Sequence, residues 1–63
     1  MSYYIGYDIG SISVNRAMVD KDGGIVSVLD YTRHMGEPFK LVAKDIKSLF
    51  DEYGSSISGI GIL

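Results

Sequence analysis

One change in hydrophobic period, close to residue 38, constrains the fold of this 63-residue chain more than any other feature. Before residue 34 the sequence is rich in β-branched and aromatic residues interrupted by glycine and aspartate, which is typical of short strands joined by turns. Over residues 38–53 the apolar residues instead recur at the i, i+3, i+4, i+7 spacing of an amphipathic helix. The pattern therefore predicts a strand-rich first half followed by one long helix.

Three strands are predicted before the helix, over residues 3–9, 13–20 and 25–33. A Gly-Ser turn separates the first two strands, and an Asp-Gly-Gly turn separates the second and third. Asp-Gly is a strong hairpin signal because glycine adopts positive φ without steric cost. Two consecutive hairpins predict an antiparallel meander of three strands. In the third strand, strict alternation predicts that Leu29 and Tyr31 share one face.

The helix is predicted over residues 38–53. Pro38 suits the first turn, where a missing N–H costs nothing, and Gly54 suits a left-handed cap after the last turn. Its buried stripe is predicted to carry seven apolar residues: Phe39, Val42, Ala43, Ile46, Leu49, Phe50 and Tyr53.

After the helix, residues 59–63 predict a fourth, buried strand, and the strand–helix–strand crossover makes it parallel to its neighbour. The order β-β-β-α-β predicts an α/β fold in a single domain unit. One helix covers only one face of a sheet, and a chain this short buries only about 60% of the surface that its unfolded form exposes. We therefore expect the unit to be incomplete alone and to need further chain or a partner surface.

Composition excludes several functional classes. The net charge of −2 and the absence of a basic patch exclude a nucleic-acid backbone as partner. The sequence has no cysteine, so it offers no disulfide, thiolate or iron–sulfur ligand. No apolar stretch has the roughly 20 residues of a membrane-spanning helix, and no secretory signal is found, so no membrane partner is expected. These features predict a cytoplasmic globular domain.

The run from Tyr4 to Ser11 points most directly to chemistry. Asp8 stands near the end of the first predicted strand, and Gly10 and Ser11 break the strand directly after it. Mg²⁺ prefers oxygen ligands and keeps several waters, so one rigidly held carboxylate can orient it. Glycine allows backbone N–H groups to approach a phosphate closely. Asp8, Gly10 and Ser11 are therefore candidates to bind the phosphates of Mg-ATP, with Asp8 contacting the metal through water.

In this order of elements, Asp8-Ile9-Gly10-Ser11 resembles the first phosphate motif of the actin-like ATPase superfamily, which includes sugar kinases, Hsp70 and actin. The resemblance implies the N-terminal part of a ribonuclease-H-like half-domain. Residues 31–38 (YTRHMGEP) and 58–62 (SGIGI) are similar to passages of one branch. That branch is the CoA-substrate-specific enzyme activases, or BadF/BadG/BcrA/BcrD-type ATPases.

Members of that branch are ATP-driven electron donors of 2-hydroxyacyl-CoA dehydratases and benzoyl-CoA reductases. They are homodimers with one [4Fe-4S] cluster held by cysteines of both subunits. The resemblance thus implies Mg-ATP, the remainder of the ATPase domain, a homodimer partner and an acyl-CoA dehydratase or reductase. Because this chain has no cysteine, it supplies no cluster ligand. We expect the 63 residues alone to contribute the first phosphate motif without hydrolysing ATP.

Two other functions fit the same order of elements. A ribonuclease-H-like nuclease, such as a Holliday-junction-resolvase-like protein, also begins with a strand-borne aspartate, and Asp30 could serve as a second acid. Asp30 is nevertheless predicted to be outward-facing and structural. The other alternative is a non-catalytic interaction module built on the same half-fold.

Several remaining polar and aromatic residues are given structural roles. His34 is predicted to lie on the surface of a polar loop, since no cysteine or second histidine accompanies it. Arg16 and Arg33 are predicted to be solvated or paired strand residues. The tyrosines of the first strand are predicted to pack in the core, and they are Tyr3, Tyr4 and Tyr7.

Overall fold

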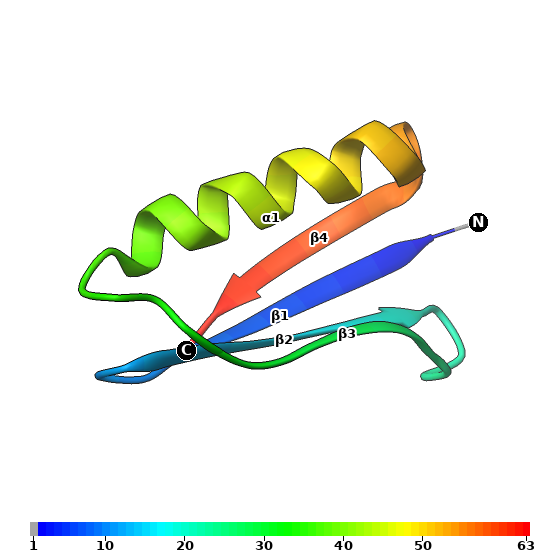
Figure 1. The fold of residues 1–63 in the computed structure, drawn as a ribbon. Coiled ribbons are helices and arrows are strands. Elements are labelled where there is room, and N and C mark those ends of the chain that lie inside the picture. The colour runs from blue at the N-terminus through cyan, green and yellow to red at the C-terminus, as the bar shows by residue number, and fades with distance from the viewer. Residues whose placement is uncertain (1) are drawn as a thin grey trace.

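The computed structural model describes residues 2–63, which form a four-stranded sheet with one helix across one of its faces (Figure 1). The elements are β1 (Tyr3–Ile9), β2 (Ser13–Asp20), β3 (Ile25–Arg33), α1 (Pro38–Tyr53), the 3₁₀ turn η1 (Gly54–Ser56) and β4 (Ile57–Ile62). The strand order is β3-β2-β1-β4. β1 pairs antiparallel with β2 and parallel with β4, and β2 pairs antiparallel with β3. The predicted α/β class, meander and parallel fourth strand are confirmed. The predicted burial of the fourth strand is wrong, because Ile60 and Ile62 are 42% and 54% exposed at the edge of the sheet.

The bounds of the first three strands and of the helix agree with the prediction, whereas β4 begins at Ile57, two residues before the predicted start. Ile57 pairs with Tyr3 and is half-buried, so the polar connection predicted from the serines around it ends earlier. Gly54 has the positive φ of 54° that the cap prediction required. Its ψ of −129° is not that of the left-handed helix, and the chain enters η1 directly.

The core forms between α1 and the face of β1 and β2 that lies beneath it. Alternate residues of these two strands and the inward residues of the helix make up the core: Ile5, Tyr7, Val14, Met18, Val42 and Leu49. Tyr3 is partly buried at the margin of the core, where its ring packs edge-on against that of Tyr53 with the ring centroids 5.1 Å apart. Of the three tyrosines predicted to pack in the core, Tyr4 is instead largely exposed, because it points to the opposite face of the sheet.

The buried stripe of α1 is rotated from the predicted one. Phe39 and Phe50 are 71% and 44% exposed, and Ala43 is also exposed, so their predicted burial is wrong. Leu41 and Asp45 face the sheet instead, together with the correctly predicted residues at the centre of the stripe. The helix lies over β1 and β2, and its ion pair with β2 through Asp45 fixes this rotation.

Strict alternation fails in β3. Arg16 of β2 pairs with Leu29 but Val14 pairs with Thr32, so one extra residue of β3 is inserted opposite Asn15. Tyr31, at this irregularity, has a φ of 26° and donates its backbone N–H to the Asn15 side-chain oxygen at 2.6 Å. Thr32 therefore shares the helix-facing side with Leu29, and the prediction that Tyr31 shares a face with Leu29 is wrong, since Tyr31 is exposed.

Within residues 2–63, no element covers the face of the sheet opposite α1 (Figure 1). This open face is hollowed into a groove of about 570 Å³ that crosses all four strands. The helix of residues 38–53 is too short and too polar to cross a membrane.

Candidate functional site

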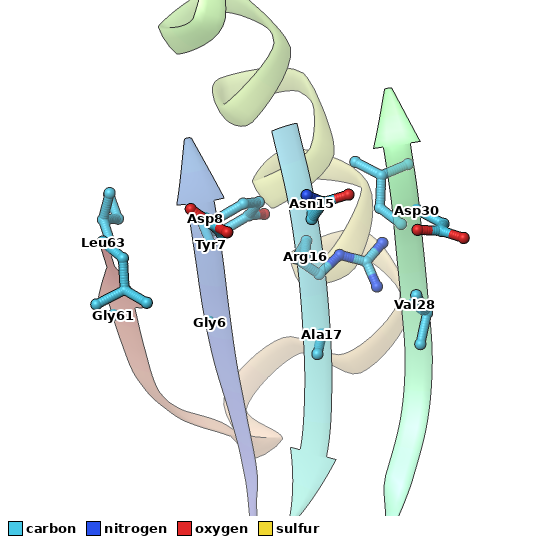
Figure 2. Close-up of a pocket in the computed structure, with 12 residues that line it drawn as sticks. Gly6, Tyr7, Asp8, Asn15, Arg16, Ala17, Val28, Asp30, Gly61 and Leu63 are labelled. Atoms are coloured by element: carbon cyan, nitrogen blue, oxygen red, sulfur yellow. The ribbon is translucent and has the colours of Figure 1, made fainter. Parts of the chain in front are cut away.

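Asp8 projects from the open face of the sheet near the end of β1 (Figure 2). Its neighbours in the strand, Tyr7 and Ile9, point the other way into or beside the core, so the alternation of β1 forces the carboxylate outward. The register places Asp8 opposite Asn15 of β2. The structure therefore holds this acid on rigid backbone with an exposed side chain.

The β1–β2 hairpin follows Asp8 directly. Its closing hydrogen bond runs from the Gly10 N–H to the Ser13 carbonyl at 2.8 Å, which leaves Ser11 and Ile12 at an exposed tip. The N–H groups of Ser11 and Ile12 make no hydrogen bond to any part of residues 2–63. Two backbone donors are thus free to bind water or an anion at the hairpin that follows Asp8.

Neither conformation nor crowding within the chain requires glycine at position 10. Gly10 does not have a positive φ, and a Cβ built on it would lie 3.5 Å from the Ser13 carbonyl oxygen, an ordinary contact. Nothing within residues 2–63 therefore explains the glycine at this position.

His34 ties the β1–β2 hairpin to the loop between β3 and α1. Its Nδ1 accepts the Gly36 N–H at 3.0 Å, so the proton is on Nε2, which donates to the Gly10 carbonyl at 3.1 Å. Its backbone N–H also donates to the Ile12 carbonyl at 3.1 Å. With only 8% of the residue exposed, the prediction of a surface histidine is wrong. The loop folds back over the hairpin, and that long-range contact buries the ring.

A buried polar cluster lies behind the site, on the helix side of the sheet. Arg16 donates two hydrogen bonds to the Asp45 carboxylate, from Nε at 2.9 Å and from Nη2 at 3.0 Å. Its Nη1 donates to the Ser27 hydroxyl oxygen at 2.8 Å. The Tyr7 hydroxyl donates to the same carboxylate at 2.6 Å. The side chains of Arg16 and Asp45 are only 6% and 11% exposed. Arg16 is thus paired, one of the two roles predicted for it.

The cluster shifts the pKa of each of its members. Burial raises the pKa of Tyr7 well above its ordinary value, and the hydrogen bond to Asp45 raises it further. The hydrogen bond with Asp45 raises the pKa of Arg16. Burial alone would raise the pKa of Asp45, but the hydrogen bonds from Arg16 and Tyr7 outweigh it and hold that pKa below the ordinary range. The carboxylate is therefore a fixed anion that holds β1, β2 and α1 together.

The open groove brings a second acid to the face that carries Asp8. Asp30 of β3 lines it as well, and Asn15 of β2 stands between the two acids (Figure 2). Asp30 is exposed, as predicted. The floor is made of small residues, Gly6 and Ala17, and no atom lies within 4 Å of a Cβ built on Gly6. The small side chains of the floor thus leave the centre of the groove open, and most of its lining is apolar.

The three predicted site residues are brought together at one end of β1, because Asp8, Gly10 and Ser11 lie on the strand end and the hairpin that follows it. Within residues 2–63, no three histidine, cysteine, aspartate or glutamate side chains gather at one point. Mg²⁺ bound to ATP needs only one or two carboxylates besides phosphate and water, so the donor set at Asp8 fits it. A [4Fe-4S] cluster does not fit this sequence, which has no cysteine.

Sequence reasoning missed the roles of His34, which holds the hairpin, and of Asp45, which holds the strands from the helix side. Asp45 had a usable signal, since it is in helical phase with Val42 and Leu49 on the buried stripe. His34 had none, because its role depends on a contact with a hairpin 24 residues away.

Fold and site together define a small α/β unit with a mixed four-stranded sheet and a strand-end carboxylate beside an exposed hairpin. Comparison with known proteins adds no relative: no protein-family model, no curated protein and no solved structure matches the chain.

Proposed function

We propose that this chain is the N-terminal, phosphate-binding segment of an ATPase of the CoA-substrate-specific activase type, within a ribonuclease-H-like half-domain. The observation that carries the proposal is that Asp8 stands exposed at the end of β1 and that the hairpin directly after it leaves the Ser11 and Ile12 N–H groups without a hydrogen bond within residues 2–63. An acid and backbone donors at one place are what a metal-bound polyphosphate requires.

Each residue has a distinct part in the proposed site. Asp8 orients the water shell of Mg²⁺, Gly10 leaves room for the phosphates, and the hairpin N–H groups donate to phosphate oxygens. Mg²⁺, when bound, neutralises phosphate charge. His34 keeps the hairpin in position through the Gly10 and Ile12 carbonyls.

The chain would supply one wall of the nucleotide site, and the rest of the ATPase domain would supply the others. In that setting the partners are a second subunit and a 2-hydroxyacyl-CoA dehydratase or benzoyl-CoA reductase in the cytoplasm. The segment binds phosphate weakly and does not hydrolyse ATP alone.

The test is an NMR titration of the ¹⁵N-labelled 63-residue protein with Mg-ATP. We expect millimolar affinity and shifts concentrated at residues 8–13 and in the loop of residues 33–36. Asp8→Asn and Gly10→Ala should each weaken binding about tenfold, or roughly 1.4 kcal/mol, while the spectrum remains that of a folded protein. Asp30→Asn, an equal change on the same face, should leave the affinity within about twofold. Unchanged affinity in Asp8→Asn would contradict the proposal.

A ribonuclease-H-like nuclease is the second candidate, and the observation that favours it is the presence of Asp30 in the same groove as Asp8. A two-metal nuclease divides its metal ligands among several carboxylates. If this function holds, Asp8→Asn and Asp30→Asn should weaken binding of Mn²⁺ alone to the same extent, and ATP should add nothing. Titrations of the same two variants with Mg-ATP and with Mn²⁺ alone therefore distinguish the two candidate functions.

A further inference from the structure

The ring of His34 joins the loop before α1 to the β1–β2 hairpin, and it must be neutral to do so. Its Nδ1 accepts the Gly36 N–H at 3.0 Å, while its Nε2 donates to the Gly10 carbonyl at 3.1 Å. A neutral imidazole has one acceptor and one donor, and both are used here. An imidazolium has two donors and no acceptor, so protonation would set Nδ1–H against the Gly36 N–H. The closed loop is therefore incompatible with a charged ring.

The surroundings of the ring do not compensate a positive charge on it. In the described part of the chain, no carboxylate lies within ion-pair distance of either ring nitrogen of His34. The charged side chains on the adjoining elements are Arg33 at the end of β3, Asp8 near the end of β1, and Glu37, which pairs with Lys40 of α1. Arg33 lines a hollow of about 90 Å³ together with His34, so it opposes a second positive charge there. A charge that is buried without a partner is costly, and only 8% of His34 is exposed.

The turn that follows His34 is held by few interactions. Met35 has a φ of 55°, which a residue with a side chain rarely adopts, and it is 82% exposed, so packing does not compensate the strain. Gly36 follows with a φ of 81°. Two hydrogen bonds close the turn, the one from the Gly36 N–H to the ring and one from the Glu37 N–H to the His34 carbonyl at 2.9 Å. Protonation removes the first of them and leaves a strained turn with the second alone.

We propose that His34 is a pH switch, and that its protonation breaks the hydrogen bond to Gly36 and releases the ring and residues 35–37 from the β1–β2 hairpin. The chain has a single histidine, and histidine is the side chain that ordinarily changes its charge between about pH 5 and 8. In the released state the side-chain hydrogen bond to Gly10 is lost, and the backbone hydrogen bond to Ile12 remains. Release of the loop does not depend on any ligand. Its consequence for the hairpin, weaker binding of Mg-ATP in acid, rests on the proposed function.

The experiment is NMR spectroscopy of the ¹⁵N-labelled 63-residue protein without nucleotide, at about pH 7 and about pH 5.5. At the higher pH the ring nitrogen shifts should show a neutral ring with its proton on Nε2. At the lower pH they should show an imidazolium. Protection of the Gly36 amide against hydrogen exchange, relative to an unstructured peptide at the same pH, should fall at least about tenfold between the two conditions.

His34→Asn removes the titrating group and keeps an acceptor for the loop. Asparagine side chains accept the N–H two residues further on in an Asx-turn, which is the geometry that His34 has with Gly36. Protection of the Gly36 amide in this variant should therefore be the same at both pH values. Glu37→Gln is the matched control, because it removes the carboxylate that follows the loop and keeps the histidine, and its loop should still open in acid.

Three results would each overturn the switch: equal protection of the Gly36 amide at both pH values in the wild type, a ring that stays neutral at about pH 5.5, or an opening that persists in His34→Asn. For the consequence, the wild type should lose several-fold more Mg-ATP affinity than His34→Asn over the same pH range. Equal losses would overturn this coupling. Failure to bind Mg-ATP at either pH would contradict the proposed function alone, because the loop is measured without nucleotide.

Discussion

At the scale of single residues, Asp45 contributes more to this fold than the exposed charges of α1. The Lys40–Glu37 and Lys47–Asp51 pairs are mostly exposed, and pairs of that kind contribute about 0–1 kcal/mol. Asp45 instead accepts three short hydrogen bonds from Tyr7 and Arg16 in a buried setting. Removing one partner from a buried pair leaves an uncompensated charge, which costs several kcal/mol.

The first prediction concerns stability against acid. The pKa of Asp45 is lowered by folding, so its contribution is fully present above the unfolded value of about 4 and is lost as pH falls through the lower folded value. Asp45→Asn should reduce the free energy of unfolding at pH 7 by about 3 kcal/mol and flatten its dependence on pH below about 4. Urea unfolding measures both quantities.

Asp51→Asn is the matched control, because it makes the same change at an exposed position of the same helix. Its free energy of unfolding should stay within about 0.5 kcal/mol of that of the wild type at pH 7. If the free energy of unfolding falls as steeply below about pH 4 in Asp45→Asn as in the wild type, Asp45 is not the group that causes the loss of stability in acid.

Tyr7 gives a matching prediction for alkali. The Tyr7 pKa is raised by folding, so its contribution to stability is present below about pH 10 and is lost as pH rises further. The free energy of unfolding of Tyr7→Phe should therefore fall less steeply above about pH 10 than that of the wild type.

At the scale of the elements, β1 and its hairpin depend on the loop between β3 and α1. His34 connects them by a backbone hydrogen bond to the Ile12 carbonyl and a side-chain hydrogen bond to the Gly10 carbonyl. Met35 and Gly36, which follow it, have positive φ values of 55° and 81°, so the chain turns sharply enough to bring the ring under the hairpin.

The next prediction is that His34→Ala loosens the hairpin without unfolding the sheet. The lost side-chain hydrogen bonds cost about 1–3 kcal/mol locally, so the Gly10 amide, whose hydrogen bond closes the hairpin, should exchange faster and the Mg-ATP affinity should fall several-fold. Met35→Ala truncates the adjacent, exposed side chain and should change neither. ¹⁵N relaxation and hydrogen exchange report on the hairpin. An unchanged hairpin in His34→Ala would show that the loop does not position it.

How much of this was predictable depends on whether the signal is local. The strand bounds of residues 3–33 and the helix of residues 38–53 follow from period and turn residues, and Asp8 follows from alternation in β1. The rotation of α1, the irregularity at Tyr31 and the burial of His34 were not predicted. Each is set by a partner distant in sequence, and these partners are Arg16, Asn15 and Gly10.

At the scale of the whole molecule, the chain is a two-layer unit with one covered face. The covered face holds the core and the Arg16–Asp45 pair, and the open face holds Asp8 and Asp30. Stability and the proposed phosphate chemistry are thus separated by the thickness of the sheet. Changes at Asp8 should leave the fold intact, whereas changes at Asp45 should leave the open face unaltered in any variant that remains folded.

The most direct test of the phosphate site is paramagnetic broadening by Mn-ATP in the ¹⁵N-labelled protein. Broadening should be strongest at Asp8, Ser11 and Ile12, be lost in Asp8→Asn, and be absent at Gly23 and Gly24 at the opposite end of β2. That opposite turn carries Asp20 and Asp22, so it is a built-in control for nonspecific binding to carboxylates. Equal or stronger broadening at Gly23 and Gly24, or no effect of Asp8→Asn, would contradict the proposed site.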